Sequence, residues 1–170
     1  ATQLPTILYD YPARTGVQFD VESLDLLADH PLVVGIKEAS GDLTRIALLH
    51  DRYGDDLAIV SGSDLLAMHY FESGSDCWIA GFANALPGEH VAMLAAVQRN
   101  DMATGWEMQH RLAPILTDVE SNHYIARTRF ALTARGIPVG APRSPLQALG
   151  AQDSAAMRAH LAELGHLCAT

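Results

Sequence analysis

The sequence has few cysteines, few aromatic residues and no long apolar run. Its 170 residues include only two cysteines, Cys77 and Cys168, and they form no CxxC pair, which argues against a disulfide framework and favours reduced thiols. No apolar run reaches the roughly 18 residues of a membrane-spanning helix, and no signal peptide is recognisable. We therefore expect a cytoplasmic protein without a membrane partner.

Positive charge is also scarce. Eleven Lys and Arg residues stand against twenty Asp and Glu, for a net charge of −9, and the basic residues form no cluster or stripe, which argues against a nucleic-acid partner. The eight histidines form no HExxH motif, and they share no metal-ligand spacing with the cysteines. We expect no metal and no cofactor, whereas a small anionic substrate stays compatible with a locally positive pocket.

What the chain does contain is enough apolar sequence for one sizeable core, with 49% hydrophobic residues and a mean hydropathy of +0.08. Four strand-like segments alternate with four helical ones, which is typical of βα units with a parallel sheet. The strand-like segments are 6–11, 33–37, 58–61 and 77–80, and the helical ones are 21–28, 44–53, 65–73 and 87–99. Because a (β/α)8 barrel needs about 250 residues, four units predict half of one.

The pattern changes after residue 99. Three further helical segments follow at 101–119, 124–135 and 154–164, separated by stretches rich in glycine and proline. We expect two regions: residues 1–99 form the second half of a barrel, and residues 100–170 form a carboxy-terminal helical region.

The stretch from residue 33 to residue 42, VVGIKEASGD, is central to the functional hypothesis. Its apolar start predicts a strand buried on both faces that ends at Lys37, and Asp42 is placed to cap the following helix. An amine at the end of a buried strand loses water, which favours its neutral, nucleophilic form. The alternative is that the strand stops before Lys37 and that the side chain points into water.

A second stretch, residues 6–16, TILYDYPARTG, has the same plan of apolar strand, polar exit and Pro/Gly turn. Tyr9 precedes Lys37 by 28 residues, about one βα repeat, so adjacent strands would bring the two side chains together. By strand alternation we expect Tyr11 to face away from them.

These two motifs, spaced as they are, resemble the dihydrodipicolinate synthase and N-acetylneuraminate lyase family of pyruvate-dependent Schiff-base aldolases. The resemblance continues through residues 61–64, 78–81 and Asn84 into the helical tail. It implies an α/β fold, a (β/α)8 TIM barrel, represented here by its last four βα units and its carboxy-terminal helices. It also implies a homo-oligomeric enzyme, a dimer or tetramer, that acts in lysine biosynthesis.

The resemblance implies roles for individual residues. Lys37 would form the Schiff base with pyruvate, Tyr9 would relay protons, and Arg14 would hold the carboxylate of the aldehyde. Gly62 and Ser63 would offer backbone N–H groups to an anion at a helix start, and the main chain of Ile79 would face the imine. The plainer readings are a core tyrosine, a solvated arginine, and turn or core residues at the other three positions.

The family's first half has no counterpart in this sequence. That half carries a Gly-Thr-Thr-Gly-Glu type loop for the pyruvate carboxylate, a threonine and a second tyrosine. We expect the 170-residue chain alone to be inactive or nearly so, and to complete a barrel with the missing amino-terminal half. Besides a lyase that condenses pyruvate with an aldehyde, two hypotheses stay open: an aldolase or dehydratase for 2-keto-3-deoxy sugar acids, and a non-catalytic half-barrel that acts as an assembly partner.

Overall fold

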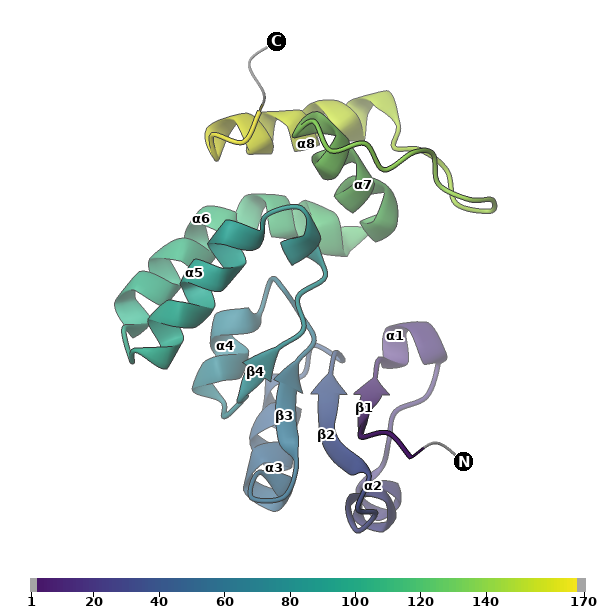
Figure 1. Cartoon of the computed structure of the whole chain (residues 1–170), viewed down its shortest axis with the longest axis vertical. Coiled ribbons are helices and arrows are strands. Elements are labelled where there is room, and N and C mark those ends of the chain that lie inside the picture. The colour runs from purple at the N-terminus through teal and green to yellow at the C-terminus, as the bar shows by residue number, and fades with distance from the viewer. Residues whose placement is uncertain (1–2, 168–170) are drawn as a thin grey trace. The chain divides into compact units, whose positions relative to one another are not determined.

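The computed structural model describes residues 3–167 and divides into two compact units, residues 1–80 and 81–170 (Figure 1). Cys168, one of the two expected reduced thiols, lies outside the described residues, and Cys77 is a half-buried free thiol. The predicted division of the chain after residue 99 stays a prediction.

The first unit is a parallel sheet of four strands in the order β1-β2-β3-β4, which confirms the predicted βα pattern. Figure 1 shows the strands side by side, with their arrows pointing the same way. The strands are β1 (Thr6–Asp10), β2 (Val33–Glu38), β3 (Ala58–Ser61) and β4 (Cys77–Trp78), and the helices are α1 (Pro12–Thr15), α2 (Val21–Ala28), α3 (Leu43–Tyr53) and α4 (Ala67–Glu72).

Local capping explains where two of the helices begin. The Asp20 carboxylate accepts the backbone N–H of Ser23 at the start of α2, and the Asp42 carboxylate accepts that of Thr44 at the start of α3. Each bond satisfies one of the backbone donors that a helix start leaves unpaired. The prediction that Asp42 caps the helix after Lys37 is confirmed.

The start of α4 was predicted wrongly. The apolar run predicts a helix from residue 65, but α4 begins at Ala67 and its N-cap, Leu66, makes no side-chain cap. Residues 63–66 instead form a turn in which the Ser63 hydroxyl accepts the N–H of Leu66. The Asp64 carboxylate instead accepts a hydrogen bond from the indole of Trp78, a tertiary contact that sequence periodicity does not indicate.

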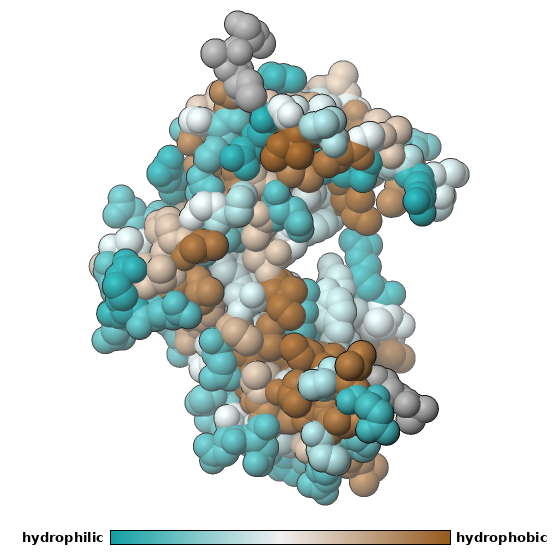
Figure 2. Space-filling model, viewed as in Figure 1, coloured by the Kyte–Doolittle hydropathy of each residue, from teal (hydrophilic) through white to brown (hydrophobic). Residues whose placement is uncertain are grey.

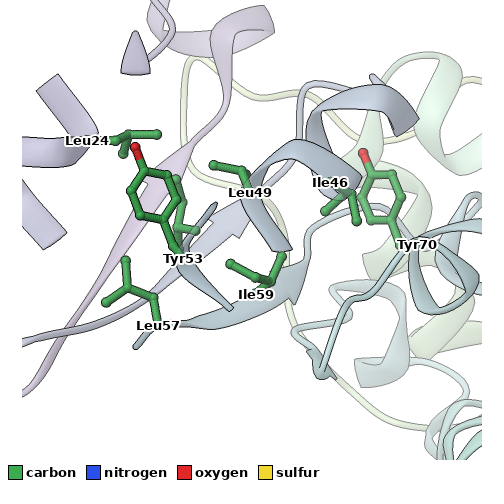
Figure 3. Packing of buried hydrophobic residues seen from close by; sticks show 8 residues of the cluster. Leu24, Ile46, Leu49, Tyr53, Leu57, Ile59 and Tyr70 are labelled. Atoms are coloured by element: carbon green, nitrogen blue, oxygen red, sulfur yellow. The ribbon is translucent and has the colours of Figure 1, made fainter. Parts of the chain in front are cut away.

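The core of the first unit lies between the sheet and its helices. Figure 3 shows leucine, isoleucine and tyrosine side chains converging there from α2, α3, α4 and the strands. The buried members are Leu24, Ile36, Ile46, Leu49, Tyr53, Leu57, Ile59 and Tyr70. The other face of the sheet is open over β1, where Ile7 and Tyr9 are exposed, whereas Val60 of β3, the register partner of Lys37, is buried.

The prediction that β2 is buried on both faces is therefore wrong in part. Val34 is exposed, and the register between β1 and β2 shifts here, so that Val34 has no partner on β1. On β1, Ile7 and Tyr9 are exposed as well. Figure 2 shows hydrophobic residues gathered on the surface over these strands.

The second unit is helical. Its elements are the short 3-10 helix η1 (Phe82–Asn84), α5 (Pro87–Gln98), α6 (Met102–Ser121), α7 (Tyr124–Ala134) and α8 (Ala151–Glu163). Helix α5 packs on α6, and α7 packs on α8. The buried Arg127 of α7 pairs with Asp118 of α6 and Asp153 of α8, so that one guanidinium joins three helices. The three helices predicted after residue 99 are present, with α8 beginning three residues earlier than expected.

Candidate active site

Lys37 and Tyr9 lie side by side on the open face of the sheet. They are partners in the parallel register of β1 and β2, so both side chains leave the same face. The Lys37 Nζ lies 4.3 Å from the centroid of the Tyr9 ring. The structure thus brings together the two residues that the sequence placed one βα repeat apart.

Burial changes the acid–base behaviour of the Lys37 amine. The side chain is half-buried, and the resulting loss of water lowers the pKa of Lys37 below its usual range. The negative charge of Asp64 acts against this shift and raises the same pKa. Desolvation is the larger effect, so a greater share of the amine is neutral near pH 7 than in an exposed lysine.

The pKa of Tyr9 is shifted in the opposite direction. Desolvation, and then the neighbouring Tyr11, raise the pKa of the Tyr9 phenol, while the positive charge of Arg14 lowers it. The hydroxyl therefore keeps its proton at neutral pH and can both donate and accept a hydrogen bond. Tyr9 is 49% exposed, so this hydroxyl is open to small molecules.

Tyr11 does not face away, and that prediction is wrong. Its ring stacks on that of Tyr9, with the two centroids 5.6 Å apart. The reason is that β1 ends at Asp10: Tyr11 is already the N-cap of α1, so strand alternation no longer sets its direction.

Arg14 lies in α1, close to this aromatic pair. Its side chain is exposed, and its Cζ lies 5.9 Å from the centroid of the Tyr11 ring. Among residues 3–167, no carboxylate lies within ion-pair distance of the guanidinium. Its planar set of N–H donors is thus open to a carboxylate ligand on the side of the sheet where Tyr9 lies.

The other three predicted positions lie at the ends of β3 and β4. Gly62 passes so close to β2 that a Cβ atom there would lie 2.3 Å from the Glu38 carbonyl oxygen, so only glycine fits without a backbone shift. Ser63 is buried in the turn before α4, and the N–H of Ile79 donates to the Ser61 carbonyl, 3.2 Å away. These contacts fix the positions of the loops, and the roles expected for Gly62, Ser63 and Ile79 stay predictions.

Two features of the site were missed at the sequence level. The first is that Lys37 is the only lysine in the chain, a fact visible by inspection. The second is Asp64, which is buried, accepts the indole N–H of Trp78 at 3.2 Å, and acts electrostatically on both Lys37 and Tyr9. The available signal for Asp64 is its place shortly after the strand that ends at Ser61.

A cleft of about 770 Å³ opens at the other end of the sheet, where β2 begins. Its lining includes Asp29, Val34 and Asp56, and neither Lys37 nor Tyr9 contributes to it. Since the carboxyl ends of the strands carry the amine and the phenol, we place the site there and not in this cleft.

Neither a metal centre nor a membrane span is found in the part of the chain that the structure describes. No group of three or more His, Cys, Asp or Glu side chains among residues 3–167 could hold a metal ion. No helix in the same range is both long and apolar enough to cross a bilayer.

Comparison with known proteins finds similarity to 4-hydroxy-tetrahydrodipicolinate synthases. The chain is 36% identical over 163 residues to the 4-hydroxy-tetrahydrodipicolinate synthase of Exiguobacterium sibiricum, which covers 96% of this chain and 54% of that protein. It is 33% identical over 151 residues to the enzyme of the same name from another Exiguobacterium strain, which covers 89% of this chain and 52% of that protein. The chain therefore spans about half the length of the curated relatives that it matches.

Solved structures agree with this assignment. Dihydrodipicolinate synthase from Acinetobacter baumannii, solved in complex with pyruvate, superposes with a TM-score of 0.91 at 30% identity, covering 98% of this chain and 57% of that one. The enzyme from Aquifex aeolicus gives a TM-score of 0.93 at 21% identity, covering 99% and 58%, which supports the fold alone. The four-stranded sheet is thus part of a TIM barrel, as predicted. Residues 1–164 match the model of the dihydrodipicolinate synthetase family, and the chain belongs to that family.

Proposed function

We propose that this chain supplies the Schiff-base half of an enzyme that condenses pyruvate with an aldehyde, as 4-hydroxy-tetrahydrodipicolinate synthase does. The observation that carries the proposal is the Lys37 amine, the only lysine side chain present, half-desolvated and 4.3 Å from the Tyr9 ring. The family to which the chain belongs and the names of its relatives support it.

The proposed chemistry begins with the neutral Lys37 amine, which attacks the ketone carbon of pyruvate. Proton transfers through the Tyr9 hydroxyl allow the carbinolamine oxygen to leave as water, which gives an iminium ion. The iminium withdraws electrons, so that the adjacent methyl group gives up a proton to water and becomes an enamine carbon. This carbon attacks the aldehyde, and the aldehyde oxygen takes up a proton through the Tyr9 hydroxyl and becomes an alcohol. Hydrolysis of the new iminium releases the product and restores the amine.

Arg14 supports an aldehyde that carries a carboxylate. Its guanidinium is exposed beside the Tyr9 and Tyr11 rings, and a planar fork of N–H donors matches a carboxylate in two parallel hydrogen bonds. No observation favours either of the other hypotheses, a sugar-acid aldolase or dehydratase or a non-catalytic assembly partner.

The proposed enzyme needs a second part besides this chain. We propose that an amino-terminal half, equivalent to the part of the relatives that this chain does not span, completes the barrel and holds the pyruvate carboxylate. Exposed Ile7 and Val34 and the unpaired edges of the sheet give such a half a surface to cover. Oligomeric assembly and a cytoplasmic place in lysine biosynthesis belong to the same proposal, although one structural relative is described as a monomeric variant.

The test is to trap pyruvate on the chain with sodium borohydride and to locate the adduct by peptide mass mapping. We expect one reduced pyruvyl group on Lys37, none in Lys37→Arg, and a slower reaction in Tyr9→Phe. Mapping separates this adduct from any on the terminal α-amino group. An adduct of equal yield in Lys37→Arg would refute the assignment, and efficient turnover by the chain alone would refute the need for a second half.

A further inference from the structure

Each member of the Lys37 and Tyr9 pair is followed in the sequence by a buried carboxylate. Asp10 follows Tyr9, Glu38 follows Lys37, and the two carboxylates are themselves register partners on β1 and β2. Strand alternation sends them to the opposite face of the sheet, the one that the helices cover. Two like charges thus lie side by side directly behind the candidate nucleophile.

A single guanidinium from α3 neutralises part of this charge. The Arg45 Nη2 lies 2.5 Å from the Asp10 Oδ2 and 2.7 Å from the Phe19 carbonyl oxygen. The side chains of Arg45 and Asp10 are only 11% and 2% exposed, so water screens this pair little. The contact ties the end of β1 to the start of α3 and to the segment before α2.

Glu38 extends the same cluster to the end of β2. Its two carboxylate oxygens accept the N–H of Ser40 at 2.7 and 3.1 Å, and the N–H of Ala39 donates to the Asp10 carbonyl at 2.9 Å. The charges of Arg45 and Asp10 both act on the Glu38 carboxyl, in opposite directions. The backbone directly after Lys37 is therefore held through Glu38 and Asp10.

Such a cluster is a costly way to hold two strands together. Removing two carboxylates and a guanidinium from water costs free energy that well-packed apolar side chains would not. The charged groups contribute directional contacts. Their hydrogen bonds fix the ends of both strands, which apolar packing alone would leave freer to shift.

We infer that Arg45 is a positioning residue that acts through Asp10 and Glu38, holding the ends of β1 and β2 so that the Lys37 amine stays beside the Tyr9 ring and partly out of water. The inference rests on the proposed function only in taking this amine to be the nucleophile. Arg45 itself touches neither of the two side chains on the open face.

The test measures the reactivity of the Lys37 amine as a function of pH, without pyruvate. Because Lys37 is the only lysine, the rate of its modification by an amine reagent, followed by peptide mapping, reports one side chain. Every variant keeps the groups whose charges act on the amine or on its phenol partner, which are Tyr9, Tyr11, Arg14 and Asp64. Circular dichroism establishes that each variant is folded.

We expect Arg45→Met to admit water to the amine, which makes it a stronger base. The reaction profile would then move to higher pH, and modification at pH 8 would slow by about threefold or more. Asp10→Asn, which keeps an acceptor for Arg45 but loses the charge, would shift the profile in the same direction by less.

The matched control is Arg52→Met. Arg52 lies two turns further along α3 and pairs with Asp25 of α2, but these two side chains are 50% and 43% exposed. This variant loses an arginine ion pair between two helices but leaves the contacts at the strand ends intact. We therefore expect the pH dependence of Lys37 modification to match that of the parent chain.

The inference is overturned if folded Arg45→Met keeps the parent profile, or if Arg52→Met shifts it as far. Should Arg45→Met fail to fold, Asp10→Asn decides alone, and an unchanged profile overturns the inference. Failure of the proposed function would look different, because pyruvate would then leave no adduct on Lys37 whatever the reactivity of its amine.

Discussion

The two faces of the sheet in the first unit carry different kinds of side chain. The face covered by α2, α3 and α4 carries the apolar cluster and, at its carboxyl edge, the Asp10, Glu38 and Arg45 cluster. The open face carries Lys37 and Tyr9, and the exposed Ile7 lies on the same strand as Tyr9. Because side chains alternate along each strand, successive residues point to opposite faces. One face therefore contributes stability, and the other carries the candidate reactive groups.

The largest effect we predict separates buried from exposed positions on α3. Leu49 is fully buried in the apolar cluster, whereas its neighbour Leu48 is exposed. We expect Leu49→Ala to lower the free energy of unfolding by about 2–5 kcal/mol, because it removes buried surface and leaves a cavity. Leu48→Ala should change it by less than about 1 kcal/mol. Urea denaturation measures both, and equal losses would contradict the assignment of the covered face.

The charged part of the covered face should show its own pH dependence. Burial raises the pKa of the Glu38 carboxyl, although the N–H of Ser40 and the charge of Arg45 lower it. The folded chain therefore holds this proton to higher pH than the unfolded chain does. The resulting stabilisation is present at low pH and is lost as pH rises through the folded pKa.

Glu38→Gln lacks this titration. Relative to the parent, its free energy of unfolding should rise as pH increases from about 4, the range in which an unfolded glutamate loses its proton. Denaturation at several pH values, with Glu22→Gln on the surface of α2 as control, measures the difference. A difference that does not change with pH would count against burial of the ionised group.

Asp64 should act on the pKa of Lys37 in the direction opposite to Arg45. The carboxylate raises the pKa of the amine, so Asp64→Asn should leave more of it neutral. We expect modification of Lys37 at pH 8 to become faster, by about twofold. Trp78→Phe, which removes the indole donor but keeps the charge, should change the rate less. A slower reaction in Asp64→Asn would show that the carboxylate has another role.

The smallest effect should come from the apolar side chains of the open face. Ile7 is exposed there, while the next residue, Leu8, packs against the apolar cluster. Ile7→Thr keeps a β-branched side chain, and we expect it to change the free energy of unfolding by no more than about 0.5 kcal/mol, against a clear loss for Leu8→Ala. Thermal unfolding of the two variants compares them directly.

Prediction from sequence succeeded where the relevant information is local. Apolar runs with polar exits located all four strands, and the expected capping by Asp42 located the start of the helix after Lys37. One βα repeat was also enough to bring Tyr9 and Lys37 together. These features depend on residues that are close in the sequence or on a regular repeat.

Prediction from sequence failed where a contact between residues distant in the sequence determines the position of a side chain. The indole N–H of Trp78 donates to the Asp64 carboxylate, and nothing near Asp64 in the sequence indicates this contact. The stacking of Tyr11 on Tyr9 depends on the strand ending at Asp10, a boundary that the apolar pattern does not fix. The pairing of Arg45 with Asp10, 35 residues apart, has no local signal at all.

The central claim is that the open face holds the Lys37 amine partly out of water. Because the chain has one lysine, nitrogen-15 labelling of that residue type gives a single ammonium signal, and its NMR titration reads the side-chain pKa directly. The structure predicts a pKa below the value of about 10.4 found in an exposed lysine. A titration at or above that value would contradict the account.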